Sequence, residues 1–206
     1  MNLLYNGSVF IQKSFTFAPM LNQVEIENIV FEKIIDSSQL KEIVESCAKQ
    51  INKDYKDKNI VFVVVLNGAF VFASDLLRQF SFPCETYFIK VSSYQGMQST
   101  NQVQISGLPS KVLEGKDVVI IEDIVDSGLT MQKLLEYLQQ EKVSSLEVCT
   151  LFFKPGNFKG NYNIKYIGKS IENDFIVGYG LDFNDKGRNL NGVYQRKNLW
   201  IMLNIA

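Results

Sequence analysis

The chain has 206 residues, of which 46% are hydrophobic and 21% are charged, and its formal net charge is −1. A chain of this size can bury a sizeable core, and its composition is ordinary for a globular protein. The near-neutral charge argues against general binding to nucleic acids or membranes. We find neither a signal peptide nor the run of about 18 apolar residues that a transmembrane helix requires.

Cysteine and histidine usage narrows both the compartment and the chemistry. The three cysteines, Cys47, Cys84 and Cys149, are scattered and have neither the spacing of a metal site nor that of a disulfide framework. We therefore expect reduced thiols in the core of a cytoplasmic protein. The sequence contains no histidine, so any acid–base step must use aspartate, glutamate, lysine or tyrosine.

The N-terminal third predicts a lobe, a helix and a buried strand. Residues 1–35 combine partial alternation with aromatic residues, which predicts short strands of a covering lobe. Apolar residues then recur at helical spacing over residues 36–51, after a capping Asp36 or Ser37. Residues 60–66 are all apolar, which is typical of an inner strand of a parallel sheet covered on both faces.

A turn, a helix, a strand and a long loop follow. The buried strand ends at Asn67 and Gly68, and an apolar stripe predicts a helix over residues 69–77. Residues 84–91 predict another strand. The polar, glycine-containing stretch at residues 93–106 is either a lid that closes over a site or an ordinary surface loop.

The most informative stretch begins with residues 118–121, a second wholly apolar strand, which Glu122 and Asp123 follow directly. Because side chains alternate along a strand, we expect these two acids to point to opposite faces. A lone carboxylate is very costly to bury, so they should lie where the sheet ends. The carboxyl edge of an open α/β sheet is where such folds bind ligands.

The strand turns into a helix through residues 126–130, which read Asp-Ser-Gly-Leu-Thr, and an apolar stripe over residues 131–138 marks the helix. Exposed amides and hydroxyls at a helix N-terminus form a cradle for a phosphate group. The alternative is that Asp126 or Ser127 only caps the helix. Capping explains one of these residues, but not three acids, a glycine and two hydroxyls in so short a stretch.

The following third adds one more buried strand, at residues 146–153, and places Lys154 at its end. Lys154 is either part of the same edge as the two acids or a surface lysine with a packed stem. Residues 155–170, rich in glycine, asparagine and lysine, are expected to form a connecting loop. Residues 178–180 read Gly-Tyr-Gly, but Phe183 stands where a dinucleotide-binding pattern requires its third glycine.

Residues 193–206 are expected to form a packing strand that holds Trp200. Neither an internal repeat nor a linker is readable, so residues 1–206 are predicted to form a single domain. Apolar strands alternating with helices predict an α/β fold with a mostly parallel central sheet flanked by helices.

The run EDIVDSGLT at residues 122–130 resembles the ribose-phosphate-binding motif of the type I phosphoribosyltransferases. The flanking features narrow the resemblance to the hypoxanthine (or hypoxanthine-guanine) phosphoribosyltransferases. The resemblance implies a small hood formed by about residues 1–35 and 165–206. It also implies transfer of ribose 5-phosphate from 5-phosphoribosyl-1-pyrophosphate to N9 of hypoxanthine, and of guanine, with release of pyrophosphate.

The resemblance further implies the residues that bind the sugar phosphate. Glu122 and Asp123 would bind the ribose hydroxyls and help to place Mg²⁺, and Asp126 would be the general acid or base at N7 of the purine. The turn at residues 127–130 would hold the 5-phosphate. The whole binding run is Glu122, Asp123, Ile124, Val125, Asp126, Ser127, Gly128, Leu129 and Thr130.

Residues of the C-terminal half match the base and pyrophosphate sites of the family. Lys154 would hydrogen-bond the exocyclic oxygen of a 6-oxopurine, Phe175 would stack on the base, and Ile176 would contact its edge through backbone groups. Asp182 would meet Mg²⁺ through water. Arg188 matches the arginine that contacts pyrophosphate in the family.

Two earlier segments complete the resemblance. Asn67 and Gly68 lie in a turn that reads Leu-Lys-Gly in the family, often contains a cis peptide bond, and helps to hold pyrophosphate. Asn67 replaces the lysine here, so backbone amides would have to supply the contact. Ser93 and Tyr94 match the Ser-Tyr pair of the family's closing loop, which favours the lid interpretation of residues 93–106.

Two other functions stay open. One is a regulatory protein that senses phosphoribosyl pyrophosphate on the same fold and controls nucleic acid, although the near-neutral charge and the lack of an added DNA-binding segment argue against it. The other is a phosphoribosyltransferase for xanthine or a pyrimidine, against which Lys154 and Phe175 favour a 6-oxopurine. As partners we expect no nucleic acid and no membrane, and by resemblance a homodimer or homotetramer.

Overall fold

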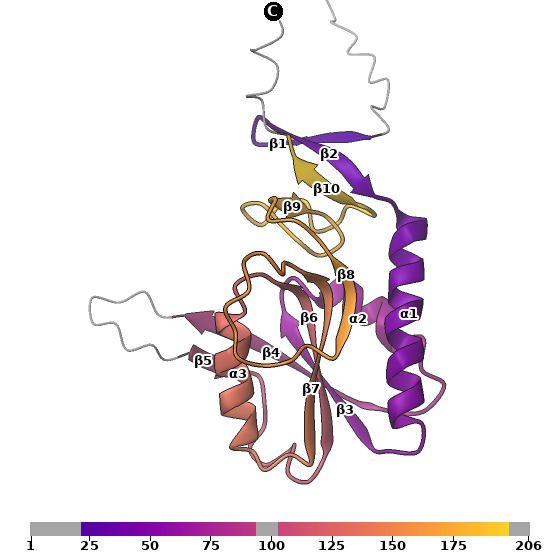
Figure 1. Ribbon diagram of the computed structural model, residues 1–206, viewed down its shortest axis with the longest axis vertical. Coiled ribbons are helices and arrows are strands. Elements are labelled where there is room, and N and C mark those ends of the chain that lie inside the picture. Colours follow the sequence, from indigo (N-terminus) through magenta and orange to yellow (C-terminus); the bar gives the residue numbers. More distant parts are fainter. Residues whose placement is uncertain (1–21, 94–102, 198–206) are drawn as a thin grey trace, which may run out of the picture.

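The computed structural model describes residues 22–93 and 103–197. Its larger part is a six-stranded sheet in the order β5-β4-β3-β6-β7-β8, parallel throughout except for β5, which runs antiparallel to β4 (Figure 1). Its strands are β3 (Ile60–Leu66), β4 (Glu85–Ser93), β5 (Val103–Ser106), β6 (Asp117–Val125), β7 (Ser145–Phe153) and β8 (Tyr166–Ser170). The predicted α/β fold with a mostly parallel central sheet is confirmed.

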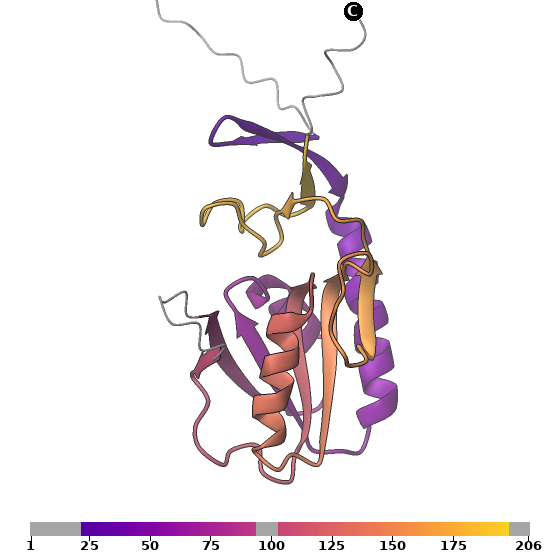
Figure 2. The ribbon, with the colours of Figure 1, turned by 60° about the vertical axis from the view of Figure 1, so that its left-hand side comes forward.

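Helices cover both faces of this sheet, as an all-apolar inner strand requires. α1 (Ser37–Tyr55) and α2 (Phe70–Leu77) pack on one face, and α3 (Leu129–Gln139) packs on the other (Figure 2). Asp36, one of the two predicted caps, begins α1. Within the described part of the chain, no helix is long and apolar enough to cross a membrane.

The strand β6 shows why the sheet needs two covers. Val119 and Ile121 pack with α1 and α2, whereas Val118 and Ile120 pack with α3. All four side chains are fully buried, and burying one such aliphatic side chain contributes about 1.5–3 kcal/mol. The unbroken apolar run therefore fixes β6 in the centre of the sheet, and with it the position of the acids that follow.

A second, antiparallel sheet forms the described part of the hood, in the order β1-β2-β10-β9. Its strands are β1 (Gln23–Ile26), β2 (Ile29–Ile35), β9 (Ile176–Val177) and β10 (Val193–Arg196). A separate small core of Ile26, Phe31, Val177 and Tyr194 holds it together. Figure 2 shows this sheet beyond one end of the larger sheet, and residues close to both chain ends build it.

Three expectations need correction or fall outside the description. The connecting loop predicted at residues 155–170 is wrong in its last part, because β8 is an edge strand paired with β7, and the hood therefore starts after Ser170. An edge strand pairs on one side only, so its apolar signal is weak. Part of residues 93–106 is strand, in β5. Strands expected before residue 22, and Trp200, lie outside the described residues.

Candidate active site

The strand β6 carries its two acids to the rim of the larger sheet. Its pairing with β3 ends at Ile121, whereas its pairing with β7 continues to Val125. The sheet therefore narrows at Glu122 and Asp123, and both side chains are partly buried there. The predicted position of the acids at the carboxyl edge is confirmed.

Glu122 lies beside the N-terminus of α3, whereas Asp123 lies against Gly68 in the turn before α2. Because α3 and α2 cover opposite faces of the sheet, this placement agrees with the expectation that the two acids point to opposite faces. Burial and the charge of Asp123 raise the pKa of Glu122 well above its ordinary value, and burial raises the pKa of Asp123. Neighbouring acids whose pKa is raised by burial are typical of functional sites.

The turn after β3 lies against this acid pair. The Leu66–Asn67 peptide bond is cis, as the resemblance implied for this turn. Asn67 is exposed and Gly68 is half-buried. A Cβ atom on Gly68 would lie 1.5 Å from Oδ2 of Asp123, so only glycine lets the carboxylate approach the turn.

The turn after β6 enters α3 through Gly128, whose φ of 76° lies in the left-handed region that favours glycine. Glycine has no side chain to cap the helix, and the Leu129 N–H donates a long hydrogen bond of 3.5 Å to the Ser127 hydroxyl. Leu129 and Thr130 are exposed. The N–H groups at this helix end are therefore open to a ligand.

A hollow of about 130 Å³ lies directly over this turn. The residues that line it come from the end of β6, the turn and the first turn of α3: Glu122, Ile124, Val125, Asp126, Ser127, Gly128, Thr130 and Met131. Ile124 and Val125 also pack into the core on opposite faces of the sheet. The structure thus places Glu122, Asp126 and the helix N-terminus around one hollow.

Asp126 is not a helix cap, because both of its carboxylate oxygens are bound by residues that follow β7. Lys154 Nζ donates to Oδ2 at 2.9 Å, and Asn157 Nδ2 donates to Oδ1 at 2.7 Å. Partial burial alone would raise the pKa of Asp126, but these hydrogen bonds and the Lys154 charge outweigh it and hold the pKa below its ordinary value. Lys154 is itself buried, so the reading of a surface lysine is wrong.

The segment at residues 157–162 braces the same turn, which the sequence reading missed. The Lys159 N–H donates to the Ser127 carbonyl at 2.9 Å, and the Tyr162 hydroxyl donates to the Gly128 carbonyl at 3.2 Å. Phe158 packs edge-on against Tyr162 and lies over Gly128. Two aromatic residues four positions apart in a Gly/Asn-rich stretch were the available signal, because a solvated loop rarely carries such a pair.

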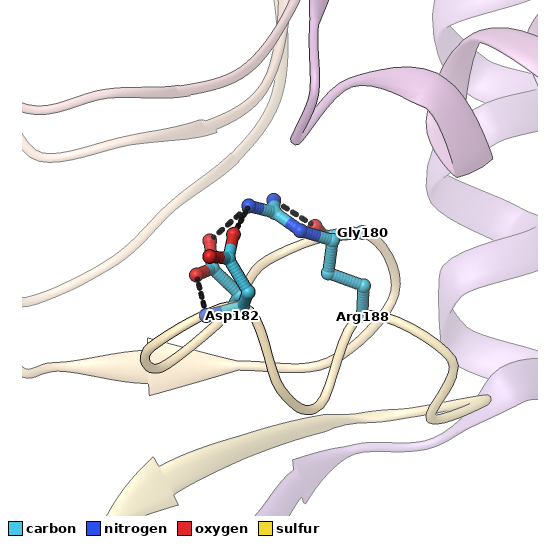
Figure 3. A network of polar contacts seen from close by, with 4 residues as sticks. Gly180, Asp182 and Arg188 are labelled. Carbon is cyan, nitrogen blue, oxygen red and sulfur yellow. Dashed lines mark hydrogen bonds and ion pairs between the residues drawn. The ribbon is translucent and has the colours of Figure 1, made fainter.

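Asp182 and Arg188 form an ion pair in the loop between β9 and β10. Arg188 Nη2 lies 2.8 Å from Oδ1 of Asp182, and Nη1 donates to the Gly180 carbonyl at 3.0 Å (Figure 3). A Cβ atom on Gly180 would lie 2.1 Å from the Gly68 carbonyl, so this loop touches the turn after β3. The positive charge of Arg188 also acts on Asp123.

Two of the predicted base-binding residues lie in the hood. Ile176 is buried in β9, and Phe175, just before it, is 46% exposed. The Phe175 ring is held by Phe183, edge-on at 5.8 Å between centroids, and by Phe31 at 6.4 Å. An aromatic face that is fixed at one edge and otherwise open suits stacking on a planar ring.

Two of the predicted residues have side chains that lie outside the described part of the structure. Ser93 ends β4, where its backbone pairs with Val103, and Tyr94 lies outside the described residues. A larger hollow of about 640 Å³ lies between α1, α2 and residues 188–191. It shares Arg188 with the predicted set but none of the acids, so the chemistry favours the smaller hollow beside α3.

The carboxylates offer oxygen donors of the kind that Mg²⁺ prefers. Among the described residues no group of three or more potential ligands lies close enough to hold a metal ion. Mg²⁺ commonly binds one or two protein carboxylates and completes its shell with substrate phosphates and water. Carboxylate donors of this kind fit an ion that arrives with a phosphorylated substrate.

Comparisons with known proteins all point to the same protein family. The phosphoribosyl transferase domain family matches residues 32–184. The hypoxanthine-guanine phosphoribosyltransferase of Staphylococcus aureus is 40% identical over 166 residues, which are 80% of this chain and 93% of that protein. The enzyme of that name from Staphylococcus epidermidis is 40% identical over 158 residues, 76% of this chain and 88% of that protein.

Solved structures agree. A crystal structure of a hypoxanthine phosphoribosyltransferase from Staphylococcus aureus superposes with a TM-score of 0.75 at 40% identity, covering 81% of this chain and 91% of that chain. A hypoxanthine phosphoribosyl transferase of Trypanosoma cruzi superposes with a TM-score of 0.76 at 30% identity, covering 84% of this chain and 94% of that chain.

Proposed function

Because the chain belongs to the phosphoribosyltransferase family, we propose that it transfers ribose 5-phosphate from 5-phosphoribosyl-1-pyrophosphate to N9 of hypoxanthine or guanine. The products are the purine nucleotide and pyrophosphate, so the reaction salvages free purines. The observation that carries this proposal is the single hollow that joins an open helix N-terminus to Glu122 and to the Lys154-bound Asp126.

The open end of α3 binds the 5-phosphate in this proposal. Backbone N–H groups of residues 127–130 and the hydroxyls of Ser127 and Thr130 supply the donors, and the helix dipole favours the negative charge. The Ser127 and Gly128 carbonyls accept hydrogen bonds from residues 159 and 162. That bracing leaves the N–H side of the turn for the ligand.

Glu122 and Asp123 accept hydrogen bonds from the ribose hydroxyls. As the bond to pyrophosphate breaks, positive charge develops on the ribose ring, and carboxylates fixed beside it stabilise that charge more than the ground state. Burial raises the pKa of both acids, and perturbed pKa values of this kind gather at functional sites.

The purine binds between the hood and the residues after β7. Phe175 stacks on the ring, backbone groups of Ile176 contact its edge, and Lys154 donates to the exocyclic oxygen of a 6-oxopurine. Asp126 accepts or returns the proton at N7, which a positioned group can accelerate about 100- to 10,000-fold. The ion pair between Lys154 and Asp126 places the oxygen-binding and proton-binding groups side by side.

Pyrophosphate binds the turn after β3 together with Arg188. Arg188 pairs with Asp182, and in this proposal the guanidinium exchanges that partner for the pyrophosphate of the substrate. The carboxylates of Asp182, Glu122 and Asp123 would hold Mg²⁺, which when bound neutralises charge on the departing pyrophosphate. Asn67 carries no charge, so the backbone amides of Asn67 and Gly68 supply the remaining donors. Ser93 and Tyr94 belong to a closing loop in this proposal.

One assay tests the function directly. The protein is incubated with phosphoribosyl pyrophosphate, Mg²⁺ and, separately, hypoxanthine, guanine, xanthine and uracil, and the nucleotide and pyrophosphate are quantified. We expect both products with hypoxanthine and guanine, and a loss of both when a chelator removes Mg²⁺. Turnover restricted to xanthine or uracil would move the proposal to another base, and ligand binding without turnover would favour a sensor.

The proposal extends to assembly and location. A homodimer or homotetramer is expected, which light scattering coupled to gel filtration measures. The two buried cysteines, Cys47 and Cys149, are free thiols, in keeping with the proposed cytoplasmic location.

A further inference from the structure

Asp126 is held by two donors of different kinds. Lys154 binds Oδ2 and Asn157 binds Oδ1, so each oxygen of the carboxylate has its own partner. Lys154 has a second task in the proposed function, because its ammonium also binds the purine oxygen. Asn157 has no such task, and its amide reaches Asp126 across 31 residues of sequence.

We propose that Asn157 is a positioning residue that fixes the orientation of the Asp126 carboxylate while Lys154 engages the purine. The inference rests on the proposed function, and it adds a residue that neither the sequence motif nor the family resemblance assigned. Asn157 acts through Asp126 and contacts no reacting atom.

The two donors differ in what they can fix. An ammonium group is a compact charge on a flexible stem with three rotatable donors, so it holds a carboxylate near without fixing its plane. A planar amide that donates one short hydrogen bond defines the direction of the oxygen it binds. Hydrogen bonds to a charged group are also the stronger kind, worth about twice a neutral one.

Asn157 can fix the orientation of the Asp126 carboxylate because contacts with neighbouring residues hold its own segment in place. Its backbone N–H donates to the Lys154 carbonyl at 3.2 Å, which closes a tight turn. The next residue, Phe158, packs edge-on against Phe153 and Tyr162, both at 5.2 Å between ring centroids. The amide therefore projects from a turn that is anchored to β7 on one side and to the turn before α3 on the other.

The titratable groups near Asp126 come from three segments. Lys154 follows β7, Glu122 lies in β6 and borders the same hollow, and the Tyr162 hydroxyl of the brace binds the Gly128 carbonyl. Glu122 is an acid, so removing a donor from Asp126 leaves its negative charge less compensated. Loss of Asn157 should therefore raise the pH at which Asp126 takes up a proton.

The test uses two variants and a matched control. Asn157→Ala removes the donor, and Asn157→Asp keeps the shape of the side chain but replaces the donor by a carboxylate. Asn161→Ala is the control, because Asn161 is exposed in the same segment and reaches Gln132 through its backbone N–H. For each protein, kcat and the two KM values are measured between pH 4 and 9.

We expect Asn157→Ala to lower kcat about tenfold with KM for phosphoribosyl pyrophosphate nearly unchanged. The acid limb of kcat should move up by about one pH unit, and further in Asn157→Asp, because a second carboxylate opposes ionisation of Asp126. Asn161→Ala should match the wild type. An unmoved acid limb in both Asn157 variants, or an equal loss in kcat and binding, overturns the proposal.

A second measurement separates this inference from the proposed function. The carboxyl carbon of Asp126 is followed by NMR against pH in the ligand-free wild type and in the Asn157 variants, which requires no turnover. A higher titration midpoint in the variants supports the positioning role even if no purine is converted. An identical midpoint overturns it even in an active enzyme.

Discussion

The N-termini of α1 and α3 solve the same chemical problem in opposite ways. At α1 the Asp36 carboxylate accepts the N–H groups of Ser38 and Gln39, both at 2.9 Å, and the Gln39 side chain accepts the Asp36 N–H. At α3 the cap is Gly128, which has no side chain, and among the described residues the first turn has only a long side-chain hydrogen bond of 3.5 Å, from the Leu129 N–H to the Ser127 hydroxyl. The start of α2, directly after Gly68, likewise has no side-chain cap in the described structure.

The difference between these helix N-termini separates a structural role from a functional one. A helix end leaves N–H groups without partners inside the helix, and leaving them unmet costs stability. The chain meets this need with Asp36 at α1, whereas α3, which borders Glu122 and Asp126, has a glycine cap and one long hydrogen bond from Leu129 to Ser127. We infer that the ends of α2 and α3 are completed by the phosphates of the substrate, and the following variants test that division.

The largest effect is expected at Asp126. Asp126→Asn keeps the shape of the side chain but removes its ability to take a proton, so kcat should fall about 100- to 10,000-fold with little change in substrate binding. Steady-state kinetics and calorimetric binding of phosphoribosyl pyrophosphate measure the two parts. The exposed Asp57, in the loop after α1, offers a matched control in Asp57→Asn. A comparable loss of binding and turnover would argue against the assignment.

The next-largest effect is expected at Gly128. A comparison with Gly115 separates the cost of a positive φ from the cost of a steric contact. Gly128 and Gly115 have nearly the same positive φ, 76° and 72°, but a Cβ atom would meet Phe158 at 2.4 Å at the first and open space at the second. Gly115→Ala should cost about 1–2 kcal/mol from backbone strain alone. Gly128→Ala should cost about 1–2 kcal/mol more and weaken binding of phosphoribosyl pyrophosphate roughly tenfold.

Denaturant unfolding and calorimetric binding measure these two glycine variants. If Gly115→Ala weakened ligand binding as much as Gly128→Ala does, the contact between the phosphate turn and its aromatic brace would have no special role.

A smaller effect, an increase in stability rather than a loss, is expected at Asp123. Its pKa is raised in the folded protein by burial, beside Glu122, so ionisation of the pair opposes folding at neutral pH. Asp123→Asn should therefore raise the Tm of the ligand-free protein by about 2–4 °C while weakening substrate binding. The gain should shrink as the pH falls, because the wild-type pair then takes up a proton.

Thermal unfolding of the ligand-free wild type and Asp123→Asn between pH 4 and 8 checks the sign of this effect. A loss of stability at pH 7 would mean that the acid pair stabilises the fold, which would contradict the separation of structural from functional residues.

The smallest effect should appear at α1. Asp36→Ala removes the cap, so the Tm should fall by about 2–4 °C, and kcat and KM should stay at the wild-type values. Thermal unfolding and the transferase assay measure the two. A change in KM for either substrate would show that the N-terminus of α1 is not purely structural.

Much of the fold could be predicted from the sequence because it depends on patterns among neighbouring residues. The strand at residues 60–66 and the helix that starts at Asp36 were predicted with nearly the observed bounds, since unbroken apolar runs and helical spacing report burial directly. The edge strand β8 was missed, because an edge strand is buried on fewer sides and its sequence carries less of that signal.

The site divides in the same way. The acids of β6 and the turn at residues 126–130 are neighbours in sequence, so one motif was enough to place them at one rim. The brace at residues 157–162 was read as a plain loop, because its contacts are made with residues about 30 positions earlier. No local pattern reports such a contact.

The sequence by itself determined which strands are buried, where each turn opens, and which acids stand beside a helix N-terminus, because each is a property of neighbouring residues. Only the tertiary structure decided that Asn157 would hold Asp126 and that Arg188 would pair with Asp182 beside the turn after β3. Those contacts depend on the parallel pairing of β6 with β7 and on the return of the chain to the hood, which join residues that are far apart in the chain.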